Sequence, residues 1–365
     1  MRIAGIEPMI VEVPMRAPVR GVHGIARLQR SVLVRITTDE GVEGWGNVDP
    51  TPGYTLMSAD DIYAAVTALA PGLIGGEACN LNAALARMDG TLAGCWEAKA
   101  AIEMALCDAK ARALGIPVHS LLGGCVKREI ALNAWIGTVP PEQAAAQARQ
   151  WRERGFRSAK IKLAGADPVG LQRVAAVREA VGPEMALRVD FNESLPAADA
   201  VAFIRQLEPY DLMLVEQPVA RERLAELAAI RRGIGIPVMA DESVVGADSL
   251  IAIIRQEAAD IVKLKVMKQG GLLRTLEMAQ IAAAAGLGVV LGHGFGLTLS
   301  TLAEATVAAV CAAVLDGCEA VGPLKMAADV VTAPVALDRG VVAIGDGPGF
   351  GVAIDPEALA RMRGA

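Results

Sequence analysis

The chain has 365 residues, with 35 basic and 41 acidic side chains, a net charge of −6 and 53% hydrophobic residues. This length suggests two domains, or one large barrel with an appendage. The acidic balance excludes a protein that binds nucleic acid through bulk electrostatics, because that mode needs a basic face. With only three histidines, a His-rich zinc site is excluded, and any metal is expected to be held by oxygen ligands.

The cysteines and the N-terminus indicate a reducing location. The six cysteines form no CxxC pair and are irregularly spaced, which favours free, buried thiols over disulfides. The first residues carry charges at Arg2, Glu7 and Glu12 and lack the basic start and apolar run of a signal peptide. The most apolar stretch, residues 302–315, contains Glu304 and is too short to span a bilayer. We therefore expect a cytoplasmic protein without membrane association.

The N-terminal third predicts an α+β module in which strands precede helices. Strand patterns lie at residues 2–13, 31–37 and 42–46, and the last two flank a hairpin turn signal at 38–41. Helical patterns follow near residues 60–71, 80–92 and 96–114. Gly115 and Pro117 supply a stop for the last helix.

From about residue 126 the pattern changes to short strands that alternate with helices, roughly one βα unit for every 23 to 32 residues. The eight strand candidates are 132–136, 158–163, 187–191, 212–216, 238–241, 261–266, 288–291 and 320–322. This rhythm favours a closed (β/α)8-type barrel over a doubly wound sheet. We assign residues 1–125 to an α+β capping domain, 126–325 to the barrel, and 326–365 to a tail that returns to the capping domain.

Three consecutive barrel strands end in carboxylates. Asp190, Glu216 and Asp241 follow one another at spacings of one βα unit. Because the active sites of barrels lie at the C-terminal ends of the strands, all three are expected to face the same mouth. A lone acidic residue at a strand end is commonly a helix cap or a turn residue. Three converging carboxylates would repel one another without a hard cation such as Mg²⁺, so the triad favours a metal site.

Two pairs of lysines flank these carboxylates. Lys160 and Lys162 share one face of their strand, and so do Lys263 and Lys265. Lysine inside an apolar barrel is costly. Either the pairs lie on an outer face, or a neighbouring ammonium lowers the pKa of one lysine so that it acts as a general base. The second interpretation places an acid/base group on each side of a metal-bound substrate, because the two strands lie across the barrel.

These residues resemble the enolase superfamily, specifically the muconate-lactonizing-enzyme subgroup of the mandelate racemase/muconate lactonizing enzyme family. Further matching segments are AAIEMALCDAKARALGIPVHSLLGG, LKVMKQGG, CEAVGPLKMAADVV and DGPGFGVAID. The resemblance covers essentially the whole chain. It implies that Lys162 and Lys265 are the paired acid/base catalysts and that Lys160 lowers the pKa of Lys162. It also implies that the ligands of Mg²⁺, or alternatively Mn²⁺, are Asp190, Glu216 and Asp241.

The resemblance also implies a reaction. The metal would bind the carboxylate of a small-molecule substrate and stabilise the enediolate formed when a lysine removes the α-proton. We expect an isomerase, either a cycloisomerase or a racemase/epimerase of a small carboxylate or amino-acid derivative, and a homo-oligomer. A dehydratase of a hydroxy acid or hydroxyproline is the alternative within the superfamily. A Schiff-base aldolase and a non-catalytic barrel are the alternatives of other classes.

Candidates for substrate contact are more varied. The resemblance places Glu319 where muconate cycloisomerase-like members carry a glutamate. The Asp-x-Asp of dipeptide epimerases is absent from residues 315–319, which argues against a dipeptide substrate. His293, in LGHGFG, is either a substrate contact or a structural turn residue.

The loops that select substrate are expected at residues 13–27 and 47–55. In the first loop, Arg16, Arg20 and His23 are candidates for pairing with a distal anionic group, and in the second Tyr54 is a candidate cover for the pocket. The same residues could equally be solvated.

Overall fold

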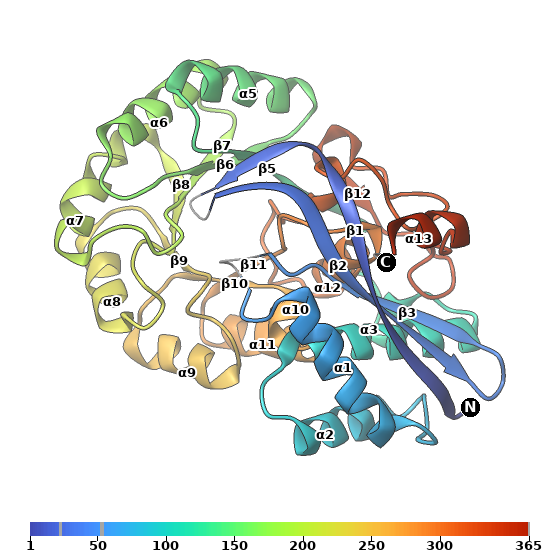
Figure 1. Cartoon of the computed structure of the whole chain (residues 1–365). Coiled ribbons are helices and arrows are strands. Elements are labelled where there is room, and N and C mark those ends of the chain that lie inside the picture. Colours follow the sequence, from blue (N-terminus) through green and yellow to red (C-terminus); the bar gives the residue numbers. More distant parts are fainter. Residues whose placement is uncertain (22–23, 52–54, 364–365) are drawn as a thin grey trace.

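The computed structural model describes the chain apart from residues 22–23, 52–54 and 364–365. An antiparallel sheet with the order β1-β2-β3 begins the chain (Figure 1). Its strands are β1 (Ile3–Gly21), β2 (Gly24–Thr38) and β3 (Glu43–Val48). The helices that follow are α1 (Ala59–Leu73), α2 (Leu81–Thr91), α3 (Trp96–Leu114) and α4 (Val118–Leu121). The predicted order of strands before helices is confirmed.

The first two strands are longer than predicted, and this changes the nature of the first expected loop. Pairing of β1 with β2 continues past an irregularity between Pro14 and Val19, and it reaches the pair Gly21 and Gly24. Residues 13–27 are therefore a two-stranded ribbon over most of their length, rather than a loop. The ribbon reaches over the barrel strands (Figure 1).

Strand β3 packs directly on α3 because both surfaces lack bulky side chains. A Cβ added at Gly46 would lie 2.0 Å from the main-chain oxygen of Ala101, and one at Gly44 would lie 2.1 Å from that of Ala105. Helix α3 in turn joins the barrel: the Glu103 carboxylate accepts the main-chain N–H groups of Leu272 and Leu273 at 2.9 and 3.0 Å. The capping sheet is thus fixed relative to the barrel through α3.

Replacing Gly46 by alanine is expected to lower the free energy of unfolding by about 3 kcal/mol, because the new methyl group collides with main chain that has no room to move. The matched control is Gly90→Ala in α2. A Cβ there would meet nothing within 4 Å, so this change should stabilise the protein by roughly 0.5–1 kcal/mol through helix propensity. Chemical denaturation measures both. Equal stability of the two variants would contradict the close packing.

The barrel consists of seven parallel strands in consecutive order from β5 to β11. The strands are β5 (Asn133–Ile136), β6 (Ser158–Lys162), β7 (Ala186–Asp190), β8 (Leu212–Glu216), β9 (Val238–Ala240), β10 (Ile261–Leu264) and β11 (Gly288–Leu291). The helices around them are α5 (Pro141–Glu153), α6 (Pro168–Val181), α7 (Ala197–Arg205), α8 (Leu224–Gly233), α9 (Ala247–Gln256), α11 (Leu272–Ala284) and α12 (Thr298–Val310), with the short α10 (Val266–Gln269) after β10. The predicted barrel-type fold is confirmed.

The eighth strand predicted at residues 320–322 is wrong. The 3₁₀ turn η2 (Gly322–Leu324) begins there and contains Pro323, which cannot donate to a strand ladder. The preceding segment, residues 314–319, takes the eighth position. On one side, the main-chain N–H groups of Leu315 and Glu319 donate to the carbonyl oxygens of Val289 and Leu291 in β11, both at 2.8 Å. On the other side, the N–H of Asn133 in β5 donates to the carbonyl oxygen of Cys318 at 2.8 Å. An irregular segment therefore closes the barrel.

The last residues pack against earlier parts of the chain. Strand β12 (Val341–Ala343) pairs antiparallel with β4 (Glu129–Ala131). Helix α13 (Pro356–Met362) lies beside β1, where Arg363 forms an ion pair with Glu7 at 2.7 Å. All six cysteines are free, as predicted. Among the helices of the described residues, none is both long and apolar enough to span a bilayer.

Candidate active site

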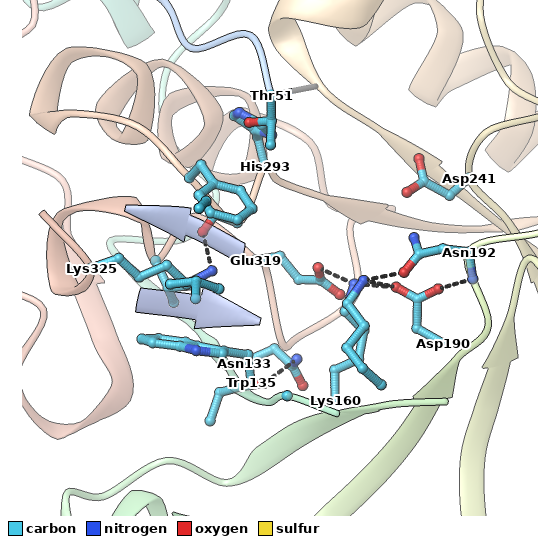
Figure 2. A pocket seen from close by; sticks show the side chains of 18 of the residues that line it. Thr51, Asn133, Trp135, Lys160, Asp190, Asn192, Asp241, His293, Glu319 and Lys325 are labelled. Atoms are coloured by element: carbon cyan, nitrogen blue, oxygen red, sulfur yellow. Dashed lines mark hydrogen bonds and ion pairs between the residues drawn. The ribbon is translucent and has the colours of Figure 1, made fainter. Parts of the chain in front are cut away.

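A cavity of about 410 Å³ lies at the C-terminal ends of the barrel strands (Figure 2). Polar side chains from β6, β7 and the residues after β9 and β10 form its floor, and the β1–β2 ribbon contributes apolar side chains to its wall. The ribbon residues Ile25 and Leu28 are 47% and 44% exposed. The cavity therefore has a highly charged end in the barrel and a mainly apolar end under the ribbon, where Arg27 adds a positive charge.

The two lysines of β6 lie on the same face, as predicted. Both ammonium groups contact the same oxygen of Asp190, Oδ2, at 2.9 Å for Lys160 and 2.6 Å for Lys162. Lys162 also donates to Oδ1 of Asn192 at 2.5 Å. Lys160 also contacts Glu216 at 3.1 Å and Glu319 at 2.6 Å. The two ammonium groups are thus close neighbours. Such closeness is required if Lys160 is to lower the pKa of Lys162, as the resemblance implies.

The two lysines that follow β10 surround Asp241, which itself follows β9. The Lys265 ammonium lies 2.7 Å from Oδ2 and the Lys268 ammonium 2.8 Å from Oδ1. Lys263 lies deeper, 3.0 Å from Glu216 and 2.5 Å from Glu319. Burial alone would lower the pKa of Lys265, but Asp241, together with Glu242 and Glu216, more than offsets this and raises it above the ordinary value. Burial lowers the pKa of Lys268 to about 8.

The three predicted metal ligands occupy neighbouring strand ends. Asp190 and Glu216 are directly paired in the β7–β8 ladder, and Asp241 follows the last residue of β9. All three are almost fully buried. Burial would raise the pKa of Asp190 and of Asp241, but the adjacent lysines hold both well below the ordinary value. Burial and the neighbouring Asp190 charge raise the pKa of Glu216.

The structure does not gather these carboxylates around one point. Among the described residues, no three His, Cys, Asp or Glu side chains are placed to hold one ion. Ammonium groups lie between the carboxylates instead: Lys160 contacts Asp190 and Glu216, and Lys263 contacts Glu216 and lies 3.9 Å from Asp241. The sequence predicted three carboxylates that face one another, whereas in the structure lysine ammonium groups lie between them.

The donor set nevertheless fits a hard divalent cation. Its members are buried carboxylates on three adjacent strands, which is the ligand chemistry that Mg²⁺ and Mn²⁺ share. One oxygen of the adjacent Glu242, Oε2, is also buried without a hydrogen-bond partner among the described residues. Negative charge is therefore concentrated at this end of the cavity, and cationic partners balance it.

His293 lines the cavity but is held by the capping domain. Its Nε2 lies 2.7 Å from the main-chain oxygen of Asp49. A carbonyl oxygen only accepts, so Nε2 carries the proton. Burial and the nearby Lys265 lower the pKa of His293 to about 3. The histidine is therefore a neutral side chain, fixed by a contact with the chain just after β3.

The remaining predicted contacts are distributed unevenly. Glu319 lines the cavity, where Lys160 and Lys263 hold its carboxylate. Arg16 is exposed, and its side chain is not among the described residues that line the cavity. The predictions for the side chain of Arg20 and for His23 and Tyr54 lie outside the described residues.

Sequence reasoning missed several cavity residues. Asn192 follows β7 by two positions and accepts a hydrogen bond from Lys162, and Arg27 and Lys325 line the wall. Lys268, which contacts Asp241 but is not among the described residues that line this cavity, stands one helical turn after Lys265, and that spacing was the only available signal for it. Lys325 follows an irregular segment, so no strand or helix period could place it.

Two family models match this chain. Residues 5–123 match "Mandelate racemase / muconate lactonizing enzyme, N-terminal domain", and residues 143–358 match "Enolase C-terminal domain-like". The chain belongs to the mandelate racemase/muconate lactonizing enzyme family. This places it in the enolase superfamily and confirms the predicted resemblance.

Relatives in this family match over nearly the full chain. An L-Ala-D/L-Glu epimerase of Bacillus subtilis is 32% identical over 96% of this chain and 97% of its own length. Muconate cycloisomerase 1 of Rhodococcus opacus is 31% identical over 98% of both. These relatives are isomerases. The prediction that this chain is an isomerase of the enolase superfamily is therefore confirmed.

Solved structures agree with this assignment. A muconate lactonizing enzyme from Pseudomonas fluorescens in complex with muconolactone has a TM-score of 0.96 and 31% identity, covering 100% of this chain and 99% of that one. A dipeptide epimerase from Cytophaga hutchinsonii, in complex with Mg and the dipeptide D-Ala-L-Val, has a TM-score of 0.94 and 29% identity over the same shares. Relatives of this fold therefore bind magnesium and small carboxylate ligands.

Proposed function

We propose that this enzyme removes and returns the proton α to a carboxylate in a small-molecule substrate, with Lys162 and Lys265 as the acid/base pair. The observation that carries the proposal is the position of these two lysines. They enter one cavity from β6 and from the end of β10, separated in the sheet by β7, β8 and β9, whose ends carry the carboxylates. A substrate held between them would meet one amine on each side of its α-carbon.

The carboxylates Asp190, Glu216 and Asp241 would hold Mg²⁺, or alternatively Mn²⁺. Bound there, the ion supplies positive charge that stabilises the negative charge developing on the substrate carboxylate as the α-proton leaves. That stabilisation is needed because such a proton is very weakly acidic. The protein's own contribution is to bury the site and to position both amines.

The protonation of Lys265 depends on its partner Asp241. The aspartate charge raises the pKa of the lysine, whereas burial lowers it. When the aspartate charge is shared with another cation, burial dominates and Nζ of Lys265 can accept a proton. Lys162 is paired in the same way with Asp190, which it shares with Lys160, and it lies on the opposite side of the proposed substrate position from Lys265.

Racemisation or epimerisation is the overall reaction that this geometry supports best, since a 1,1-proton transfer uses both lysines. Cycloisomerisation, the second candidate, uses only one of the two lysines. The similarity to muconate cycloisomerases over the whole chain supports this candidate. None of the relatives named above supports the dehydratase, aldolase or non-catalytic alternatives.

Proton exchange in D₂O tests the shared step. With Mg²⁺ present, we expect α-deuterium incorporation into at least one member of a panel of N-acyl amino acids, amino acids and dicarboxylates, followed by mass spectrometry and chiral chromatography. EDTA should abolish the exchange. The absence of exchange in every compound, with metal binding verified by calorimetry, would refute the proposal.

A further inference from the structure

Lys325 is a buried lysine at the cavity wall that none of the motifs above explains. It follows η2 and is 7% exposed. Its ammonium lies 4.4 Å from the ring centroid of Trp135 and 4.2 Å from that of Phe295. It also donates to the main-chain oxygen of Gly294. Figure 2 shows Lys325 beside Trp135, on the other side of the cavity from Asp190 and Asn192.

The surroundings of Lys325 are shaped for its ammonium group. A Cβ added at Gly294 would lie 3.3 Å from Nζ, so a side chain at this position would crowd the amine. Trp135 and Phe295 present aromatic rings, which attract cations. The site is therefore specific for a cation rather than an accidental gap.

Lys325 differs from the other lysines of the cavity in its partners. Each of Lys160, Lys162, Lys263 and Lys265 forms an ion pair with at least one carboxylate. Among the described residues, no carboxylate forms an ion pair with the Lys325 ammonium. The Glu319 carboxylate is held by Lys160 and Lys263, and its charge acts on Lys325 only from a greater distance. Burial, followed by the charges of Lys162 and Lys160, lowers the pKa of Lys325 to about 7. A buried cation without an anion is unfavourable, and proteins retain such groups mainly where they serve a function.

The cavity beside Lys325 limits what its partner can be. Trp135 lies next to it, and the wall of the same cavity includes Val321 and the ribbon residues Ile25, Leu28 and Arg27. A ligand that reaches from the lysines of the barrel floor to Lys325 would pass along this mainly apolar wall. Its far end would then meet a cation that forms no ion pair within the described residues and that Glu319 influences only from a distance.

We propose that Lys325 is a specificity-determining residue that binds a second carboxylate group of the substrate, at the end remote from the α-carbon. The inference rests on the proposed function, because it takes the α-carboxylate to lie at the metal end. It names a substrate class: dianionic compounds in which an apolar or amide-linked spacer separates two carboxylates. An ion pair with this carboxylate would also raise the pKa of Lys325 and keep it protonated.

Matched probes test the charge at the remote end. N-succinyl-L-alanine and its neutral terminal amide, N-succinamoyl-L-alanine, have nearly the same shape and differ in the second carboxylate. A glutaryl pair extends the reach. For the Mg²⁺-loaded enzyme, kcat/KM for α-deuterium exchange and Kd by calorimetry are measured for each probe. We expect at least one dianion to be preferred over its amide by about 100-fold, with the difference in KM and Kd.

The variants assign this preference to Lys325. Lys325→Met should lower kcat/KM for the dianion about 100-fold more than for the amide, whereas Lys325→Arg, which retains the charge, should keep most of the preference. The control is Lys127→Met, since Lys127 donates to the main-chain oxygen of Val314 and does not line the cavity. This control should leave the preference of the wild type intact. Circular dichroism verifies folding.

The outcomes separate this inference from the proposed function. Binding that prefers the dianion and depends on Lys325, without exchange in any probe, would support the inference and contradict the proposed function. Exchange without any preference for a dianion would do the reverse. The inference is overturned if the enzyme binds each dianion and its amide equally, or if it binds no dianion. It is also overturned if Lys325→Met still prefers the dianion.

Discussion

Replacing Lys265 by alanine is expected to abolish racemisation and to lower the rate of α-proton exchange from one enantiomer by about 1,000-fold. Lys162→Ala should abolish racemisation equally but suppress exchange from the opposite enantiomer. The reason is that each lysine serves one side of the substrate. With one lysine removed, the other still takes its proton and returns a deuteron, so the remaining exchange is specific for one enantiomer.

The measurement is deuterium incorporation into each enantiomer of the preferred substrate, for both variants. Mg²⁺ affinity is determined beside it, because each lysine contacts a predicted metal ligand. Lys127→Ala, a change outside the cavity, controls for the loss of a partly buried lysine. Loss of exchange from both enantiomers in one variant, with full activity in the other, would indicate a one-base reaction such as cycloisomerisation.

The second large effect is expected for Glu216→Gln, which should weaken Mg²⁺ binding by about 100-fold and reduce turnover at least as much. Glu216 is fully buried, and it accepts from Lys160 at 3.1 Å and from Lys263 at 3.0 Å. Removing its charge deprives both the metal and these lysines of a partner. A stability loss of about 3 kcal/mol is therefore also expected, since a buried cation loses its counter-charge.

Calorimetric titration with Mg²⁺ and chemical denaturation measure the two consequences separately. The matched control is Glu222→Gln, an exposed residue after the same strand, for which both values should remain close to those of the wild type. Unchanged Mg²⁺ affinity in Glu216→Gln, together with full turnover in EDTA, would remove Glu216 from the metal site and contradict the proposed chemistry.

Parts of the structure with a regular period were predictable from the sequence. Strand β6 and its neighbours were found because short strands alternate with helices at a spacing of one βα unit, and the carboxylates were then placed at the ends of three of them. The alternation of side chains correctly placed Lys160 with Lys162 and Lys263 with Lys265. The eighth position failed because residues 314–319 have no regular alternation, and their hydrogen bonds are shared between β5 and β11.

Contacts between distant parts of the chain were not predictable in this way. His293 is fixed by the main chain of Asp49, 244 residues away in sequence, and Lys160 meets Glu319 across 159 residues. The carboxylates illustrate a different limit. Their strand positions followed from the spacing, but the way in which lysines lie between them depends on the length and rotation of each side chain, which no pattern records.

The irregular closure of the barrel has a consequence for how such an enzyme can diversify. The proposed metal ligands and both proposed catalytic lysines lie on or directly after strands of the regular ladder, whereas Glu319 and Lys325 lie within or just after the segment without one. The hydrogen bonds that hold this segment between β5 and β11 are made by its main chain, so side-chain changes in it can leave them in place. Selection can therefore alter which compound is accepted while the proton-transfer machinery persists, and grafting residues 314–326 between members of the family is a direct route to new substrate preferences.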